Sequence, residues 1–142
     1  MLLYRAMACP YFYPVARFET SSWVVPPRLP LGDPYTGECR AADIAFQPDE
    51  TRIRHICNLG YGRGRCDCFP DRASADAVRF HVSRDAGELI HIQYVFEKEC
   101  WPQGHGAFDC DGATGNLSNG PDDQILRKQA SAFIESYLRR KS

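Results

Sequence analysis

Alternating apolar and polar residues mark two strands in the middle of the chain. Residues 77–84 (AVRFHVSR) and 88–97 (ELIHIQYVFE) each repeat with a period of two, which predicts an antiparallel hairpin with one apolar face. The intervening Asp85-Ala86-Gly87 fits a three-residue loop with Gly87 in the left-handed conformation. This loop places Arg84 opposite Glu88, so that paired residue numbers sum to 172. The apolar pairs that result all lie on one face: Val82 with Ile90, Phe80 with Ile92 and Val78 with Tyr94.

The pattern after this hairpin predicts two shorter strands and a helix. A third strand is expected around 107–110 and a fourth short one near 116–117, so the sheet occupies about 77–118. Residues 121–141 form an amphipathic helix that opens at Pro121, carries acidic residues in its first turn and ends in basic ones. Its packing face, which we expect to cover the sheet, follows a 3-4 spacing: Ile125, Leu126, Gln129, Ala132, Phe133, Ser136 and Tyr137.

The first half of the chain lacks such periodicity. Residues 1–40 are rich in proline and aromatic residues, which predicts extended chain and turns wrapped over a core, with turn signals at 32–34 and 36–37. Residues 48–58 predict one short helix that begins at Pro48 and ends near Asn58. The expected fold is therefore α+β. A small antiparallel sheet is covered by a C-terminal helix, and a loop-rich, metal-binding part (1–70) is held by a cysteine-ligated centre, all within a single domain (1–142).

Composition narrows the classes of protein. The chain has 142 residues, 44% of them hydrophobic, and a net charge of −1, which argues against disorder and against a global attraction to nucleic acid or acidic membranes. The N-terminus lacks the pattern of a signal peptide, and no apolar run is long enough to span a bilayer. We therefore expect a cytoplasmic, reducing location, where cysteine clusters hold metal more often than they form structural disulfides.

Cysteine is the residue type that carries the candidate chemistry. Five of the seven cysteines lie in the loop-rich part, and four of these are the candidate ligands: Cys9, Cys39, Cys57 and Cys66. Thiolates select zinc, Cu(I) or iron–sulfur clusters, and four of them complete either a tetrahedral zinc site or a cubane cluster. The gaps of 30, 18 and nine residues contain no close pair of the kind zinc modules use. Scattered single ligands suit a [4Fe–4S] cluster held by several loops, and these four residues are the expected ligands.

Three alternatives stay open. The first is zinc in place of the cluster, and the second is Cys68 in place of Cys66, since the two form a C-x-C pair. The third is that the cysteines are merely buried small apolar residues, which fits Cys100 and Cys110 better because they flank strands. His81 and His91 pair on the outer face in the predicted register, but they lack a third ligand and are expected to be ordinary surface side chains.

The arginines between Arg52 and Arg72 give that segment a local positive charge. They predict either an RNA-contacting surface on a zinc-stabilised interaction module or, as we favour, compensation for the negative charge of a cluster. Four ligands would close every iron, which indicates electron transfer, redox sensing or a structural role with a redox partner protein. With three ligands one iron would be open to catalysis on a small anion, anchored by Arg63 or Arg65. The sequence carries no signal for an oligomeric state.

Overall fold

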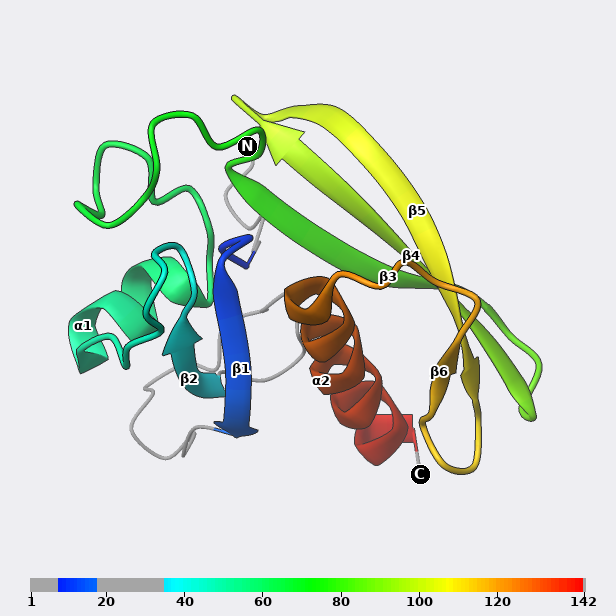
Figure 1. The fold of residues 1–142 in the computed structure, drawn as a ribbon. Coiled ribbons are helices and arrows are strands. Elements are labelled where there is room, and N and C mark those ends of the chain that lie inside the picture. Colours follow the sequence, from blue (N-terminus) through cyan, green and yellow to red (C-terminus); the bar gives the residue numbers. More distant parts are fainter. Residues whose placement is uncertain (1–7, 18–34, 142) are drawn as a thin grey trace.

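The computed structural model describes residues 8–17 and 35–141. Two antiparallel sheets and a C-terminal helix make up the fold, as expected for the α+β class (Figure 1). The turn predicted at 32–34 and most of the prolines of the N-terminal segment lie outside the described residues. Within the described part, no helix is both long enough and apolar enough to cross a bilayer.

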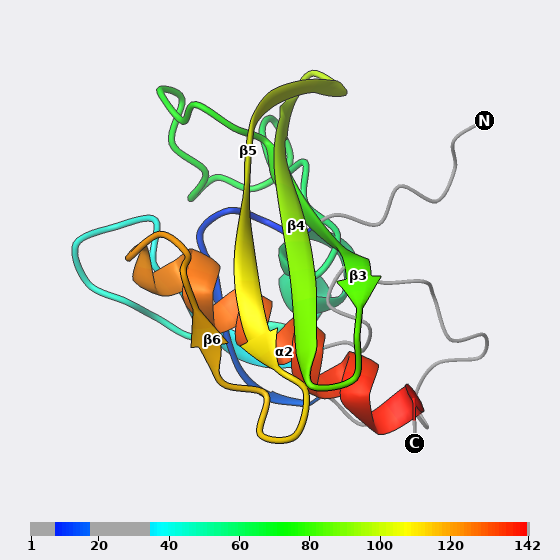
Figure 2. The same cartoon turned by 90° about the vertical axis from the view of Figure 1, so that its right-hand side faces the viewer.

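The larger sheet has four strands in the order of the chain: β3 (Ala77–Asp85), β4 (Leu89–Lys98), β5 (Trp101–Asp111) and β6 (Leu117–Ser118). Figure 2 shows β4 and β5 as long strands that run side by side and bend over together at one end. The third strand is much longer than the predicted 107–110, and it begins directly after a tight turn at Glu99 and Cys100, both with positive φ. Cys100 in this turn is exposed, contrary to our expectation, whereas Cys110 is fully buried.

The predicted faces of the hairpin are confirmed, but its predicted register is wrong. Val78, Phe80, Ile90 and Ile92 are buried together, and Gly87 has a φ of +85°. Val82 pairs with Ile92 rather than with Ile90, because Asp85 is still part of the strand and a register shift follows Val82. The bulge adds one residue to β3, and the turn comes one residue later than predicted.

This shift also separates the two histidines of the outer face. His81 pairs with Gln93, and His91 pairs with Arg84 on one side and with Asp109 on the other. The His91 Nδ1 atom lies 2.8 Å from Asp109 Oδ1, and Asn119 donates a hydrogen bond to the other oxygen of that carboxylate. The histidines therefore form no cross-strand pair.

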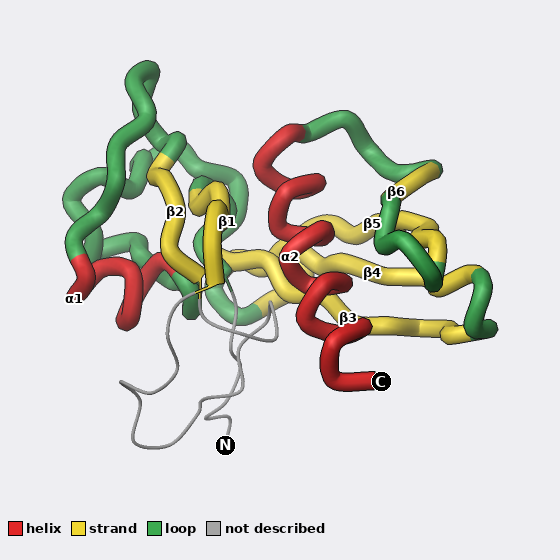
Figure 3. The backbone as a smooth tube through the Cα atoms, turned by 90° about the horizontal axis from the view of Figure 1, so that it is seen from below, coloured by secondary structure: helices red, strands yellow, loops and turns green. Residues whose placement is uncertain are grey.

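Helix α2 (Gln124–Lys141) begins after Asp123, whose carboxylate accepts a hydrogen bond from the backbone N–H of Leu126. Its apolar side packs on the larger sheet, with the rings of Phe133 and Phe80 stacked 5.7 Å apart. Seen from below, the helix lies between the larger sheet and a second, two-stranded sheet (Figure 3). The predicted helix and the surface it covers are thus confirmed.

The second sheet was not predicted. It consists of β1 (Phe12–Arg17) and β2 (Tyr35–Cys39), which pair in antiparallel fashion with a register shift at Pro14. The predicted helix at 48–58 is present as a short α-helical turn, α1 (Glu50–Arg52), which continues directly into a π-helix, η2 (Ile53–Cys57). Asp49 caps this element by accepting a hydrogen bond from the Arg52 N–H, so the helix begins two residues after the predicted start at Pro48. It ends at Cys57, with Asn58 as its C-cap, close to the predicted end.

Candidate metal centre

The four predicted ligands line one pocket, although they come from four separate segments. Cys9 precedes β1, Cys39 ends β2, Cys57 ends η2, and Cys66 lies in the loop before β3. Cys68 also lines this pocket, whereas Cys100 and Cys110 do not. The free space is small, about 20 Å³, so a group bound here would touch the sulfur atoms directly. The remaining walls are mostly apolar: Tyr11, Phe12, Ala41, Phe46, Pro48, Ile56 and Phe69.

Backbone hydrogen bonds place Cys9 beside Cys57. The Cys9 N–H donates to the Cys57 carbonyl at 3.0 Å, and the preceding Ala8 forms a bridge to Val78 of β3. From the other side, the side-chain amide of Gln129 in α2 donates to the carbonyls of Cys9 (2.8 Å) and Phe12 (2.7 Å). Gln129 is fully buried, so these bonds fix the Cys9 turn between the helix and the sheet.

The π-helix determines where Cys57 lies. The Asn58 N–H bonds to the carbonyl of Ile53, five residues back, which is the wide turn that defines a π-helix. The buried Asn58 side chain accepts a hydrogen bond from the Tyr35 N–H and donates to the carbonyls of Tyr35 and Ile53. One amide thus connects the end of the helix to the start of β2, the strand that ends at Cys39.

Two further local arrangements place Cys39 and Cys66. Cys39 is opposite Phe12 in the β1–β2 pair, and it exchanges backbone hydrogen bonds with Phe46. The Cys66 N–H donates to the Gly62 carbonyl at 2.7 Å, which closes a tight turn. A Cβ atom on Gly62 would lie 3.0 Å from Ile56 and 3.4 Å from the Cys66 Cβ, so glycine permits the loop to pack against η2.

The thiols interact with one another and share an unfavourable environment for negative charge. Every one of the six pairs among Cys9, Cys39, Cys57 and Cys66 is close enough to interact electrostatically. Burial, reinforced by the Cys39 and Cys66 thiolates, raises the pKa of Cys9 to about 12. Burial and the neighbouring thiolates also raise the pKa of Cys57 and of Cys39. The pocket therefore favours neutral thiols unless a cation compensates their charge.

Arg52 is the arginine that reaches this site. It lines the pocket, and its guanidinium donates to Asp67 at 2.7 Å and lies 3.9 Å from the Cys68 sulfur. Arg63 instead donates to Asp76 and to the carbonyls of Asp71 and Ala73. These contacts make Arg63 part of the scaffold.

The second proposed anchor, Arg65, donates to the carbonyl of His55 and does not line the pocket either. Neither of the two arginines proposed as anchors for a substrate anion therefore lines the pocket.

A buried polar network fastens the Cys66 loop to the larger sheet, and sequence reasoning did not identify it. Asp76 accepts a hydrogen bond from Arg63 at 2.7 Å and another from the Glu99 N–H at 2.9 Å. Tyr61 donates a hydrogen bond to Glu97. Glu97 is only 1% exposed, since a bulge after Phe96 interrupts the alternation of β4 and turns this side chain inward. For Gln129 the sequence did contain a signal of a buried polar contact, because this long polar residue lies in the middle of an apolar helix face.

The chain matches none of the protein-family models, curated proteins or solved structures with which it was compared. Its own residues therefore carry the functional argument.

Proposed function

We propose that this protein binds a [4Fe–4S] cluster through Cys9, Cys39, Cys57 and Cys66, and that it transfers or senses electrons. The observation that carries the proposal is the convergence of these thiols, with all six pairs in electrostatic contact, from segments as far apart as residues 9 and 66. Four buried or half-buried thiols in one apolar pocket are the donor set that such a cluster uses.

The spacing of the sulfur atoms favours a cluster over a single zinc ion. Tetrahedral zinc with Zn–S bonds of about 2.3 Å brings its four sulfurs to roughly 3.8 Å from one another. In the described residues, the group of potential ligand atoms that all lie within 4.8 Å of one another is Cys66, Asp67 and Cys68, and it includes none of Cys9, Cys39 and Cys57. In a cubane each thiolate binds a different iron, so the four cysteine sulfurs lie farther apart than they do around one zinc ion. A site whose sulfurs are not all within 4.8 Å of one another therefore suits a cubane better.

The surroundings support an electron-transfer role. A bound cluster would supply one-electron redox chemistry, and four thiolates would leave no iron open to a substrate. Tyr11 and Phe69, which meet edge to face with ring centres 5.6 Å apart, give the pocket an aromatic wall. Arg52 supplies positive charge beside the thiolates. Cys9 and Cys57 are buried whereas Cys39 and Cys66 are partly exposed, so a redox partner protein would approach from the side of Cys39 and Cys66.

Anaerobic purification tests the proposal. The visible spectrum and the iron, sulfide and zinc contents should be measured on one sample, with Cys57→Ser beside Cys100→Ser, an exposed thiol outside the pocket, as the matched control. We expect a brown protein with about four irons and four sulfides, unchanged by Cys100→Ser and lost in Cys57→Ser.

Two results would contradict the proposal. A colourless protein with one zinc would support the zinc-stabilised interaction module instead, and salt-dependent RNA binding would then be the next test. A protein free of metal even after reconstitution with iron and sulfide would reduce the pocket to a core of neutral thiols.

A further inference from the structure

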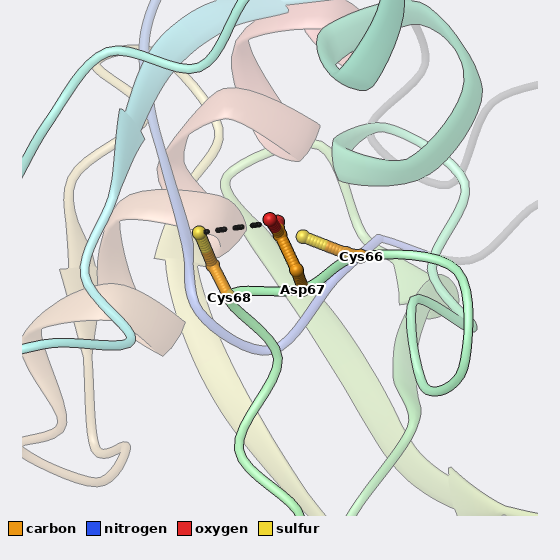
Figure 4. A group of neighbouring side chains, drawn as sticks. All are labelled: Cys66, Asp67 and Cys68. Atoms are coloured by element: carbon orange, nitrogen blue, oxygen red, sulfur yellow. Dashed lines mark hydrogen bonds between the residues drawn. The ribbon is translucent and has the colours of Figure 1, made fainter.

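Three potential ligand atoms converge at the outer edge of the pocket. The side chains of Cys66, Asp67 and Cys68 extend from one loop toward the same point, and their sulfur and oxygen atoms all lie within 4.8 Å of one another (Figure 4). In a fully extended strand, side chains two residues apart also share a face, but here the loop turns between them and brings the ends together. The proposed function uses Cys66 and gives no role to Cys68.

Cys68 is connected to one side of the centre only. It lines the pocket and interacts electrostatically with Cys66 and Cys39, whereas its buried counterparts Cys9 and Cys57 interact with each other and with Cys39 and Cys66. The Cys68 thiol donates to Asp67 at 3.7 Å, and Arg52 holds the same carboxylate at 2.7 Å. Cys68 is therefore kept beside the Cys66 sulfur by contacts that do not involve the other three proposed ligands.

The two inner ligands are held in a different way. Cys9 and Cys57 are joined to each other by a backbone hydrogen bond, and Gln129 and Asn58 hold the segments around them. The Cys66–Cys68 loop is anchored instead by local bonds, from the Cys66 N–H to Gly62 and from the Phe69 N–H to Cys66. The centre thus combines two fixed corners with one corner at which two thiols are available on a single loop.

We propose that Cys68 is a second ligand for the cluster iron that Cys66 binds, so that the two thiolates can exchange at that corner. In the exchange the bond from iron to the Cys66 sulfur breaks and a bond from the same iron to the Cys68 sulfur forms. The proton of the Cys68 thiol passes to the Cys66 thiolate, and no electron is gained or lost. Arg52, which interacts electrostatically with both sulfurs, would stabilise the negative charge that develops on the departing sulfur before that sulfur takes up the proton. This inference rests on the proposed cluster and deepens it by identifying the one corner at which the iron can be released and recaptured.

Paired substitutions at the two corners test the proposal. Cys66→Ser, Cys68→Ser, the double variant and Cys57→Ser should be purified anaerobically beside the wild type, with iron and sulfide counted per chain. We expect the wild type and both single variants at positions 66 and 68 to retain about four irons and four sulfides. The double variant and Cys57→Ser, which has no spare thiol, should lose most of both. Cys57 is a better control than Cys39, because Cys68 interacts with Cys39 as well.

The outcomes separate this inference from the proposed function. A wild type without cluster overturns both. If the wild type holds a cluster but Cys66→Ser loses as much iron as Cys57→Ser does, the exchange alone is overturned. A double variant that keeps its cluster also overturns the exchange alone. Far-UV circular dichroism of each variant shows whether lost iron reflects a lost ligand or a lost fold. Electron paramagnetic resonance of the reduced cluster should differ between Cys66→Ser and the wild type if Cys68 has taken over the corner.

Discussion

The two parts of this molecule are specified in different ways. In residues 77–141 a repeating pattern places apolar side chains on one face of a sheet and one face of a helix, and these faces pack together. In residues 8–17 and 35–76, single contacts decide the structure: the amide of Asn58, the amide that Gln129 extends from α2, and a partly buried ion pair between Arg63 and Asp76. Buried residues of both parts join in one hydrophobic core, so the two parts differ in how their structure is specified. We expect the cysteine-bearing part to depend more strongly on the group that we propose its thiols bind.

Loss of the proposed cluster should affect the two parts most differently. A group that binds only the folded state raises the free energy of unfolding by about 4 kcal/mol when its free concentration is a thousand times its dissociation constant. We therefore expect amide hydrogen exchange in residues 35–69 of the Cys57→Ser variant to reveal an opening free energy lower by at least about 4 kcal/mol. Residues 89–111 should change little. Equal loss of protection in both parts would show that they form one cooperative unit.

A cavity made in the larger sheet should destabilise the sheet and leave the cysteine-bearing part's metal content unchanged. Phe108 is fully buried and lies with its ring 5.7 Å from that of Tyr94. Phe108→Ala should lower the free energy of unfolding by about 3–5 kcal/mol in urea titrations followed by circular dichroism. Phe108→Leu, the milder control, should lower it by about 1 kcal/mol. Metal content per folded chain should be unaffected, and its loss in Phe108→Ala would mean that the sheet supports the pocket more directly than we infer.

Loss of a single amide should loosen only the cysteine-bearing part. Asn58→Ala removes three buried hydrogen bonds and leaves the Tyr35 N–H without a partner, which costs about 1–3 kcal/mol. Hydrogen exchange should localise the effect to β2 and η2. The matched control is Asn116→Ala on the surface, since the hydrogen bonds seen for Asn116 use its backbone. An effect of equal size at both positions would contradict the assignment of Asn58 as a clamp.

The smallest expected effect is a dependence on pH through Asp76. Burial raises the pKa of this carboxyl, but hydrogen bonds from the Glu99 N–H and from Arg63 outweigh it, so the net pKa is lowered below 3.8. A lowered pKa stabilises the fold above the ordinary value, and this contribution disappears as the pH falls through the folded-state pKa. The free energy of unfolding should therefore fall between about pH 5 and about pH 3, and less so in Asp76→Asn. An unchanged slope in that variant would exclude Asp76 as a source of the acid sensitivity.

What could be predicted from the sequence follows the same division. The period of two between Val78 and Tyr94 predicts which side chains are buried, because alternation is a property of the strand itself. The register was wrong because the bulge near Ser83 depends on how the backbone pairs, which leaves no mark in composition. The β1–β2 pair was missed because Pro14 and Gly37, both poor strand residues, face each other in it.

The candidate site was partly accessible for a chemical reason. Cysteine is rare and its chemistry is narrow, so residue type and position alone were enough to propose four cysteines in a loop-rich segment as one group. The choice among arginines could not be made in this way. Arg52 and Arg63 are the same residue type in the same charged segment, and only the fold turns one toward the pocket and the other toward Asp76.

The π-helical turn at Ile53–Cys57 makes the centre depend on the number of residues as well as on their identity. A π-turn contains one residue more than an α-turn, and each residue of a helix rotates the next by about 100°. Deleting any one residue between Asp49 and Cys57 would therefore turn the cysteine away from the other thiols without replacing a single ligand. We therefore expect a related chain with a one-residue gap in this segment to lack the proposed centre, even where all four cysteines are kept.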